Sequence, residues 1–213
     1  QTVMSARSRC DALVLVSPRQ PELGPDFLDE LAPVVVINHS VNGPTPSVGV
    51  DYAAGVTEVA THLVGLGHRH LVYLAGPDRS EPNMLRQHAL TEFAAARGIK
   101  LEVLTAGASI EAGYASGEAV LATGATGVLA FNDLVAYGLL ACLNELGVDV
   151  PGDFSVAGFD DVPLAKFAFP PITTAAVSYV DLGINAWRHL EWLLKIGPAV
   201  RTPDLVPQLR VRA

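Results

Sequence analysis

Polar side chains stand directly after several short apolar runs of this sequence, and their types suit the binding of a small polar molecule. The pairs that follow the runs VVVI, VLAF and SVAGF are Asn38 with His39, Asn132 with Asp133, and Asp160 with Asp161. Carboxylates and amides can exchange hydrogen bonds with hydroxyl groups. In parallel sheets, ligands sit outside the carboxyl ends of the strands. We therefore expect these residues to border one crevice.

The adjacent carboxylates Asp160 and Asp161 could form a catalytic pair or a metal site. Neighbouring residues of a strand or turn point in different directions, which argues against both reaching one atom. We expect Asp160 to accept hydrogen bonds from a bound polar ligand, while Asp161 caps the turn that follows. The alternative is a pair of turn residues that only satisfy backbone donors.

Three further polar residues have both a structural and a functional interpretation. One residue of the pair Asn132 and Asp133 is expected to cap the following helix, which leaves the other to face the crevice. Arg86 lies in the helical segment NMLRQHAL, where an arginine ordinarily occupies a solvated face. If that helix borders the crevice, its guanidinium could clamp a pair of hydroxyls or a carboxylate.

The sequence offers little for catalysis or metal binding. His68 and His70 are spaced i,i+2 without a third ligand nearby, which favours a polar turn over a zinc site. The sequence contains no GxSxG, HExxH, P-loop or GxGxxG motif. Cys10 and Cys142 are far apart and read as free thiols of a reducing compartment, although one long-range disulfide stays open. We therefore predict no enzyme, no metal and no cofactor.

Short apolar strands alternate with amphipathic helices, a pattern typical of an α/β fold with parallel sheets covered by helices. Strands are predicted over residues 11–17, 33–40, 71–76, 101–107, 127–132, 153–160 and 205–212. Helices are predicted over residues 52–67, 83–98, 110–124, 133–147 and 181–197. The Pro-rich segments 42–47 and 170–178 are predicted crossovers between two subdomains. Trp187 and Trp192, in the last helix, are expected in the core or in an interface.

The composition describes a globular chain with an acidic surface. Of the 213 residues, 50% are hydrophobic, and the net charge is −8. Such a charge repels phosphate, so the chain by itself is a poor binder of nucleic acid or anionic membranes. Its apolar runs are far shorter than the ~20 residues that span a bilayer. The first twenty residues do not read as a signal peptide.

Four segments together resemble the effector-binding domain of the lactose/galactose repressor (LacI–GalR) family of transcriptional regulators. The segments are residues 10–18, 50–77, 128–161 and 169–183. The second contains a GHR-strand-GP element, the third an ND-helix and a VP-strand-GFDD element, and the fourth PP-ITT. The resemblance implies the periplasmic-binding-protein type I fold, in which two Rossmann-like lobes with parallel sheets close on an effector. The first lobe, incomplete here, would comprise residues 1–49 plus 179–197, and the second residues 50–178 plus 198–213.

The resemblance also implies the residues that contact an effector, usually a sugar or a purine. By position in the family motifs these are Asn38, His39, Ser80, Arg86, Asn132, Asp160 and Tyr179, with Asp161 structural. The chain departs from the family pattern in three places. Ala108 stands where many members have an aromatic that stacks on the ligand, the usual glycine is replaced near Ala89, and Asn38 replaces a frequent aspartate. These departures leave the effector open.

The family resemblance implies partners that this chain alone does not supply. Members begin with a DNA-binding headpiece and two further β-α units, which are not in this sequence, so operator DNA would be bound only through the parent protein. The resemblance further implies a homodimer, a cytoplasmic location and no membrane contact. Two alternatives stay open on the same fold. One is a periplasmic sugar-binding receptor of a transport system, and the other is an enzyme, for which no site residues assemble.

Overall fold

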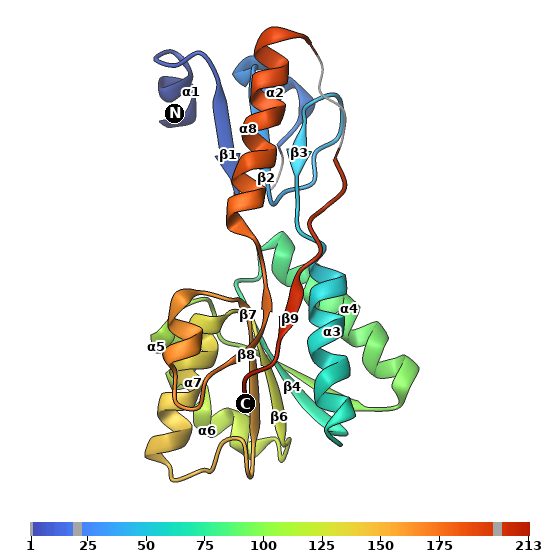
Figure 1. Ribbon diagram of the computed structural model, residues 1–213, viewed down its shortest axis with the longest axis vertical. Helices are drawn as coiled ribbons and strands as arrows, with labels where there is room; N and C mark the ends of the chain where they lie inside the picture. The colour runs from blue at the N-terminus through green and yellow to red at the C-terminus, as the bar shows by residue number, and fades with distance from the viewer. Residues whose placement is uncertain (1, 19–22, 198–201) are drawn as a thin grey trace. The chain divides into compact units, whose positions relative to one another are not determined.

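The computed structural model describes residues 2–18, 23–197 and 202–213, which form two compact units (Figure 1). Unit 1 comprises Gln1–Asp51 and Ser178–Leu205, and unit 2 comprises Tyr52–Val177 and Val206–Ala213. The chain therefore passes between the units three times. The sequence analysis set the last passage after residue 197. In the structure Leu205 still belongs to unit 1, because its amide donates to the carbonyl of Gly49 at 2.9 Å.

Unit 1 contains a parallel sheet of three strands among the described residues, in the order β1-β2-β3. Its elements are α1 (Thr2–Arg7), β1 (Leu13–Val16), α2 (Pro25–Leu31), β2 (Val34–Ile37), β3 (Ser47–Val48) and α8 (Tyr179–Lys195). Every residue of β2 is buried, and α8 packs on β2 and β3. The predicted crossover at 42–47 is wrong. It lies inside unit 1, where Pro46 and Ser47 continue into β3 beside β2.

Unit 2 contains a sheet of six strands among the described residues, in the order β5-β4-β6-β7-β8-β9. Its strands are β4 (His70–Ala75), β5 (Lys100–Thr105), β6 (Gly127–Ala130), β7 (Ser155–Asp160), β8 (Thr173–Ala176) and β9 (Gln208–Arg210). All neighbours are parallel except β9, which runs antiparallel to β8. The predicted crossover at 170–178 contains a passage between the units, at Val177 to Ser178, and its residues Thr173–Ala176 form β8 inside this sheet.

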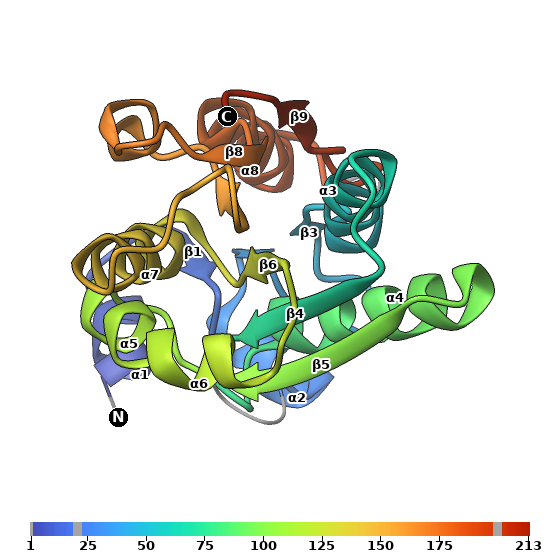
Figure 2. The ribbon, with the colours of Figure 1, turned by 90° about the horizontal axis from the view of Figure 1, so that it is seen from below.

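Helices cover both faces of the unit 2 sheet, with α3 and α4 on one face and α5, α6 and α7 on the other (Figure 2). They are α3 (Tyr52–Gly65), α4 (Glu81–Arg97), α5 (Ile110–Ala115), α6 (Gly117–Ala122) and α7 (Asp133–Glu145), with the 3₁₀ helix η1 (Pro163–Phe167) after β7. The α/β fold with parallel sheets is thus confirmed. Within the described ranges, no helix combines the length and hydropathy needed to cross a membrane.

The predicted helix over residues 110–124 is divided into α5 and α6 at Ser116. Its glycines allow close packing between helices. A Cβ on Gly113 would overlap the carbonyl oxygen of Val135, and one on Gly138 would overlap that of Ile110. Only residues without a side chain let the backbones of α5 and α7 approach so closely. This packing holds α7 against the sheet, with its first residues at the end of β6.

Candidate functional site

The predicted site residues belong to both units. Asn38, His39 and Tyr179 lie in unit 1, and Ser80, Arg86, Asn132 and Asp160 lie in unit 2. In unit 2, all but Arg86 stand at or shortly after the carboxyl ends of parallel strands, which are β4, β6 and β7 respectively. Arg86 comes from α4 and reaches the same edge of the sheet, because its Nη1 donates to the carbonyl of Phe131.

Arg86 is buried, with only 3% of its surface exposed. Its guanidinium carbon lies 4.7, 4.6 and 4.0 Å from the ring centroids of Tyr52, Phe131 and Phe159. Aromatic rings at these distances attract a cation through their quadrupoles. Its Nε is buried without a hydrogen-bond partner among the described residues. The interpretation of Arg86 as a residue of a solvated face is therefore wrong, and its helix does border the strand ends.

Asn132 serves as the cap of α7. Its Oδ1 accepts from the amide of Val135 at 2.9 Å, and its Nδ2 donates to the carbonyl of Ala108 at 3.2 Å. Both ends of the side-chain amide are therefore fixed by the chain. Because an amide group carries a second N–H and a second lone pair, Asn132 keeps the capacity to bond to a ligand.

Asp133 does not face a crevice, contrary to the expectation that the residue which does not cap the helix would do so. Only 1% of its surface is exposed. It accepts hydrogen bonds from Thr174 Oγ1 at 2.6 Å and from the amide of Val162 at 2.8 Å. Burial raises the pKa of Asp133 to about 7, and the charges of Asp160 and Asp161 act in the same direction, while the two hydrogen bonds lower it. Asp133 therefore joins α7, β8 and the turn after β7.

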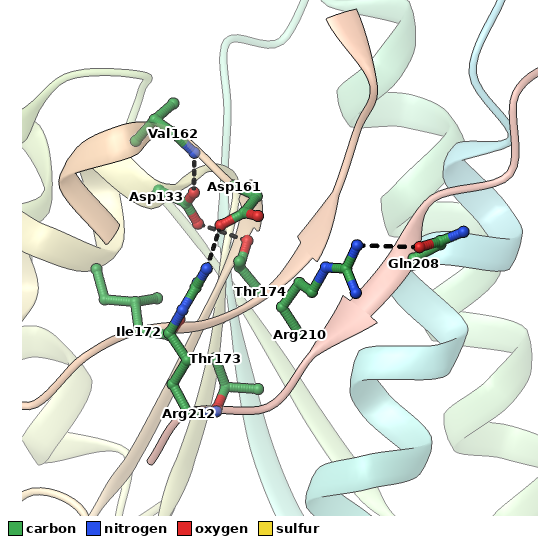
Figure 3. A network of polar contacts seen from close by, with 9 residues as sticks. All are labelled: Asp133, Asp161, Val162, Ile172, Thr173, Thr174, Gln208, Arg210 and Arg212. Carbon is green, nitrogen blue, oxygen red and sulfur yellow. Dashed lines mark hydrogen bonds and ion pairs between the residues drawn. The ribbon is translucent and has the colours of Figure 1, made fainter. Parts of the chain in front are cut away.

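Asp160 and Asp161 form that turn, and both have a left-handed backbone, with φ of 107° and 58°. Such conformations cost residues other than glycine on the order of 1–3 kcal/mol and concentrate at functional sites. Asp161 Oδ1 pairs with Arg212 Nη2 at 2.5 Å (Figure 3). Asp161 was expected to cap the turn that follows, but the backbone amide of Val162, after the turn, donates to Asp133 instead. Asp161 thus has a structural ion pair, as the family resemblance implied.

Ser80 caps α4, since its Oγ accepts from the amide of Asn83 at 3.4 Å. Asn83, which was not predicted as a site residue, is 3% exposed. Its Oδ1 accepts from Tyr73 Oη at 2.9 Å and from the amide of Gly76 at 2.8 Å. Burial raises the pKa of Tyr73 to about 12, although the nearby Arg86 opposes the rise. These bonds fix the loop between β4 and α4. The signal in the sequence was an asparagine three residues after the capping serine.

In unit 1, Asn38 directly follows β2 and has φ of 56°. Its amide donates to the carbonyl of Val48 at 3.0 Å, and its Oδ1 is buried without a hydrogen-bond partner among the described residues. His39 is partly exposed, and Tyr179, the first residue of α8, is 50% exposed. Buried acceptors are rarely left unpaired in folded proteins, so the Oδ1 of Asn38 suits a donor from a ligand.

The histidine pair of the sequence analysis has structural partners. His68 bonds to Thr126 Oγ1 at 2.8 Å and to Ser155 Oγ at 3.0 Å, and burial lowers its pKa. His70 Nε2 lies 2.7 Å from Glu102 Oε1. In the part of the chain that the structure describes, no group of three or more His, Cys, Asp or Glu could hold a metal ion. Cys10 and Cys142 are both free, as predicted.

Known proteins resemble this chain over nearly its whole length. Residues 60–213 match the model of the periplasmic binding protein-like domain. The HTH-type transcriptional regulator MalR of Streptomyces coelicolor is 32% identical over 189 residues, which cover 84% of this chain and 54% of MalR. The chain thus spans about half the length of the curated relatives it matches.

Two solved structures are also similar. A LacI transcriptional regulator from a Rhodococcus species is 28% identical, with a TM-score of 0.90 over 99% of this chain and 80% of that one. A LacI-family regulator from Arthrobacter sp. FB24, solved in complex with lactose, is 26% identical, with a TM-score of 0.87 over 99% and 81%. The chain therefore belongs to the periplasmic binding protein-like domain family, in the form that serves as the effector-binding domain of LacI-family transcriptional regulators.

Proposed function

We propose that this chain binds a sugar or a related polar metabolite as the effector-binding domain of a bacterial transcriptional regulator. The observation that carries the proposal is the convergence of Arg86, Asn132 and Asp160 at the carboxyl edge of the unit 2 sheet. A guanidinium, an amide and a carboxylate supply fixed donors and acceptors for hydroxyl groups. The lactose bound to the related Arthrobacter regulator supports a sugar as the ligand class.

The proposed contacts in unit 1 are Asn38, His39 and Tyr179, and those in unit 2 are Ser80, Arg86, Asn132 and Asp160. A ligand favours one conformation of the chain by its difference in affinity between conformations, and by nothing else. The chain connects the units at three places, so a change in their arrangement would act on all three connections. Operator DNA would be bound by another part of the parent protein, since this chain carries a net charge of −8.

We further propose that the parent protein is a cytoplasmic homodimer. Support comes from exposed apolar side chains around η1, where Phe167 and Phe169 are 74% and 92% exposed. Contiguous exposed apolar residues commonly mark protein interfaces. A periplasmic receptor was the alternative, but the relatives named above are regulators of transcription. The site also lacks an assembled nucleophile and base among the described residues, which favours binding over catalysis.

The experiment is thermal unfolding of this chain with a panel of monosaccharides, disaccharides, sugar phosphates, nucleobases and nucleosides. A ligand at 100 times its dissociation constant adds about 2.7 kcal/mol to the free energy of unfolding, which is easily seen. We expect one class of sugar to raise the melting temperature and to be recovered unchanged afterwards. A cooperative melt that no sugar shifts would contradict the proposed ligand class, and a ligand recovered as product would contradict a pure binding function.

A further inference from the structure

We propose that Arg212 is a positioning residue of the effector site, which sets the conformation of the turn at Asp160 and Asp161 and thereby the direction of the Asp160 carboxylate. The ligand-binding consequence rests on the proposed function. The conformational claim does not, because it concerns contacts inside unit 2 alone.

The turn needs support from outside its own residues. Two consecutive residues other than glycine have positive φ, a backbone that relaxes unless the surroundings hold it. At least three contacts among the described residues hold the turn. The carbonyl of Asp160 accepts from the amide of Val177 at 3.3 Å, the amide of Val162 donates to Asp133 at 2.8 Å, and the Asp161 side chain pairs with Arg212. Only the last of these anchors involves the side chain of a turn residue.

Arg212 is itself fixed at several atoms (Figure 3). Its Nη2 pairs with Asp161 Oδ1 at 2.5 Å, and its Nη1 donates to the carbonyl of Ile172 at 2.8 Å. Its backbone amide donates to Thr173 Oγ1 at 3.0 Å. The strand β9 just before it pairs with β8. The guanidinium therefore joins the turn after β7 to the start of β8, and its own backbone is bonded to the same strand.

The ion pair between Arg212 and Asp161 should stabilise the turn more than an ion pair on the exposed surface would. The side chains of Arg212 and Asp161 are only 20% and 26% exposed, so solvent screens them poorly. Asp160 and Asp161 lie close enough to Asp133 for their charges to raise its pKa, although burial raises it more. Without the guanidinium, Asp161 would keep a carboxylate near two others and lose its cation. We therefore expect the turn to move when Arg212 is neutral.

The chain offers a matched control at the end of β9, two residues away. Arg210 stands two residues before Arg212, and its Nη2 donates to Gln208 Oε1 at 3.1 Å. That bond is exposed and does not reach the turn. Replacing either arginine by glutamine removes one positive charge from the end of the chain, so a difference between the two variants reports on the position of the charge.

The first measurement is amide hydrogen exchange of the free protein in Arg212→Gln, Arg212→Lys and Arg210→Gln. We expect exchange at residues 160–162, above all at the amide of Val162, to be at least about tenfold faster in Arg212→Gln than in the wild type, because the bond from Val162 to Asp133 opens more often. The β4 amides serve as an internal reference and should not change. Arg212→Lys should restore part of the protection. Equal exchange in Arg212→Gln and Arg210→Gln would overturn the inference.

The second measurement is the affinity for lactose, or for whichever sugar of the panel binds, well below the melting temperature of every variant. We expect Arg212→Gln to bind about tenfold more weakly, which corresponds to about 1.4 kcal/mol, and Arg210→Gln to bind like the wild type. If Arg212 acts through Asp161, then Asp161→Asn combined with Arg212→Gln should lose no more affinity than Arg212→Gln alone. Full additivity, or unchanged affinity despite faster exchange, would refute the positioning role.

The two measurements separate this inference from the proposed function. If no sugar binds the wild type, the proposed ligand class fails while hydrogen exchange still decides whether Arg212 holds the turn. If a sugar binds and exchange at residues 160–162 is the same in both glutamine variants, the proposed function stands and the role of Arg212 is refuted.

Discussion

The guanidinium carbon of Arg86 lies 4.0 Å from the centre of the ring of Phe159, and Phe159 immediately precedes Asp160. Its Nη1 also donates to the carbonyl of Phe131, the residue immediately before Asn132. One buried cation is thus packed against the last apolar residue before each of two proposed ligand contacts. Arg86 therefore supports the ends of β6 and β7 besides offering a donor to an effector.

Substitution of Arg86 should affect both binding and stability. Arg86→Ala removes contacts with three rings and the donor to Phe131, so we expect a lower melting temperature together with an affinity loss of roughly 1–3 kcal/mol. Asp160→Ala should weaken binding by a similar amount, since it leaves a ligand hydroxyl unpaired. Calorimetric titration of both variants with the cognate sugar checks this. Wild-type affinity in both would show that the effector binds elsewhere.

The pH dependence of stability should report on Asp133. Its pKa in the folded protein is about 7, well above the usual pKa of an aspartate in an unfolded chain, so between these two values the folded form holds a proton that the unfolded form has lost. The free energy of unfolding should therefore fall as pH rises through this window, by about 1.4 kcal/mol per pH unit at most. Urea unfolding at a series of pH values measures the slope.

Asp133→Asn is the matching variant for that slope. The amide oxygen can still accept from Val162, and its NH₂ group can donate to the Thr174 hydroxyl, so the network survives without an ionisable group. We expect this variant to lose the fall in stability between pH 4 and pH 7. A slope equal to that of the wild type would mean that Asp133 ionises normally in the folded protein.

Most strands and helices were predictable because each carries its own periodicity, whereas the short elements α2, β3 and η1 were not predicted. The segment at residues 170–178 was not predicted as a strand either, since it begins with two prolines and reads as a turn. It becomes β8 because Thr173 and Thr174 are buried beside β7 and bond to Arg212 and Asp133. These partners lie about forty residues away in the sequence, so the local pattern around residues 170–178 could not predict them.

The site residues show the same limit. The positions of Asn132 and Asp160 at strand ends follow from local pattern, and the structure has them there. The burial of Arg86 depends on Tyr52, Phe131 and Phe159, which lie far from it in sequence and meet it only in the folded sheet. Tertiary contacts of this kind override the ordinary preference of arginine for solvent.

Close packing of α5 on α7 gives a test of the fold. A Cβ at position 138 would overlap the carbonyl oxygen of Ile110, which is backbone and cannot move aside cheaply. We expect Gly138→Ala to destabilise the protein by about 1–3 kcal/mol or more. Gly65→Ala is the control, because nothing lies within 4 Å of its Cβ, and it should be neutral or slightly stabilising. Thermal unfolding compares them, and equal melting temperatures would contradict the packing.

The proposed homodimer can be tested at the exposed aromatic residues of unit 2. Phe169 is 92% exposed and Phe167 is 74% exposed, next to Leu164 at 37%. If this surface is the interface, Phe169→Glu places a charge in a buried apolar contact and should convert the dimer to a monomer in sedimentation velocity. Its melting temperature should then depend less on protein concentration than that of the wild type, since only a dimer is stabilised by mass action.

Trp187 provides the comparison that locates the interface. It lies on α8, in unit 1, and is 63% exposed. Of the two predicted positions, the core and an interface, the exposure of Trp187 rules out the core. Trp187→Glu removes an exposed aromatic of similar size from the other unit. If the dimer forms through the residues around η1, this variant sediments like the wild type while Phe169→Glu is monomeric. A monomer from Trp187→Glu and a dimer from Phe169→Glu would assign the interface to α8 instead, and a monomeric wild type would refute the homodimer for this chain.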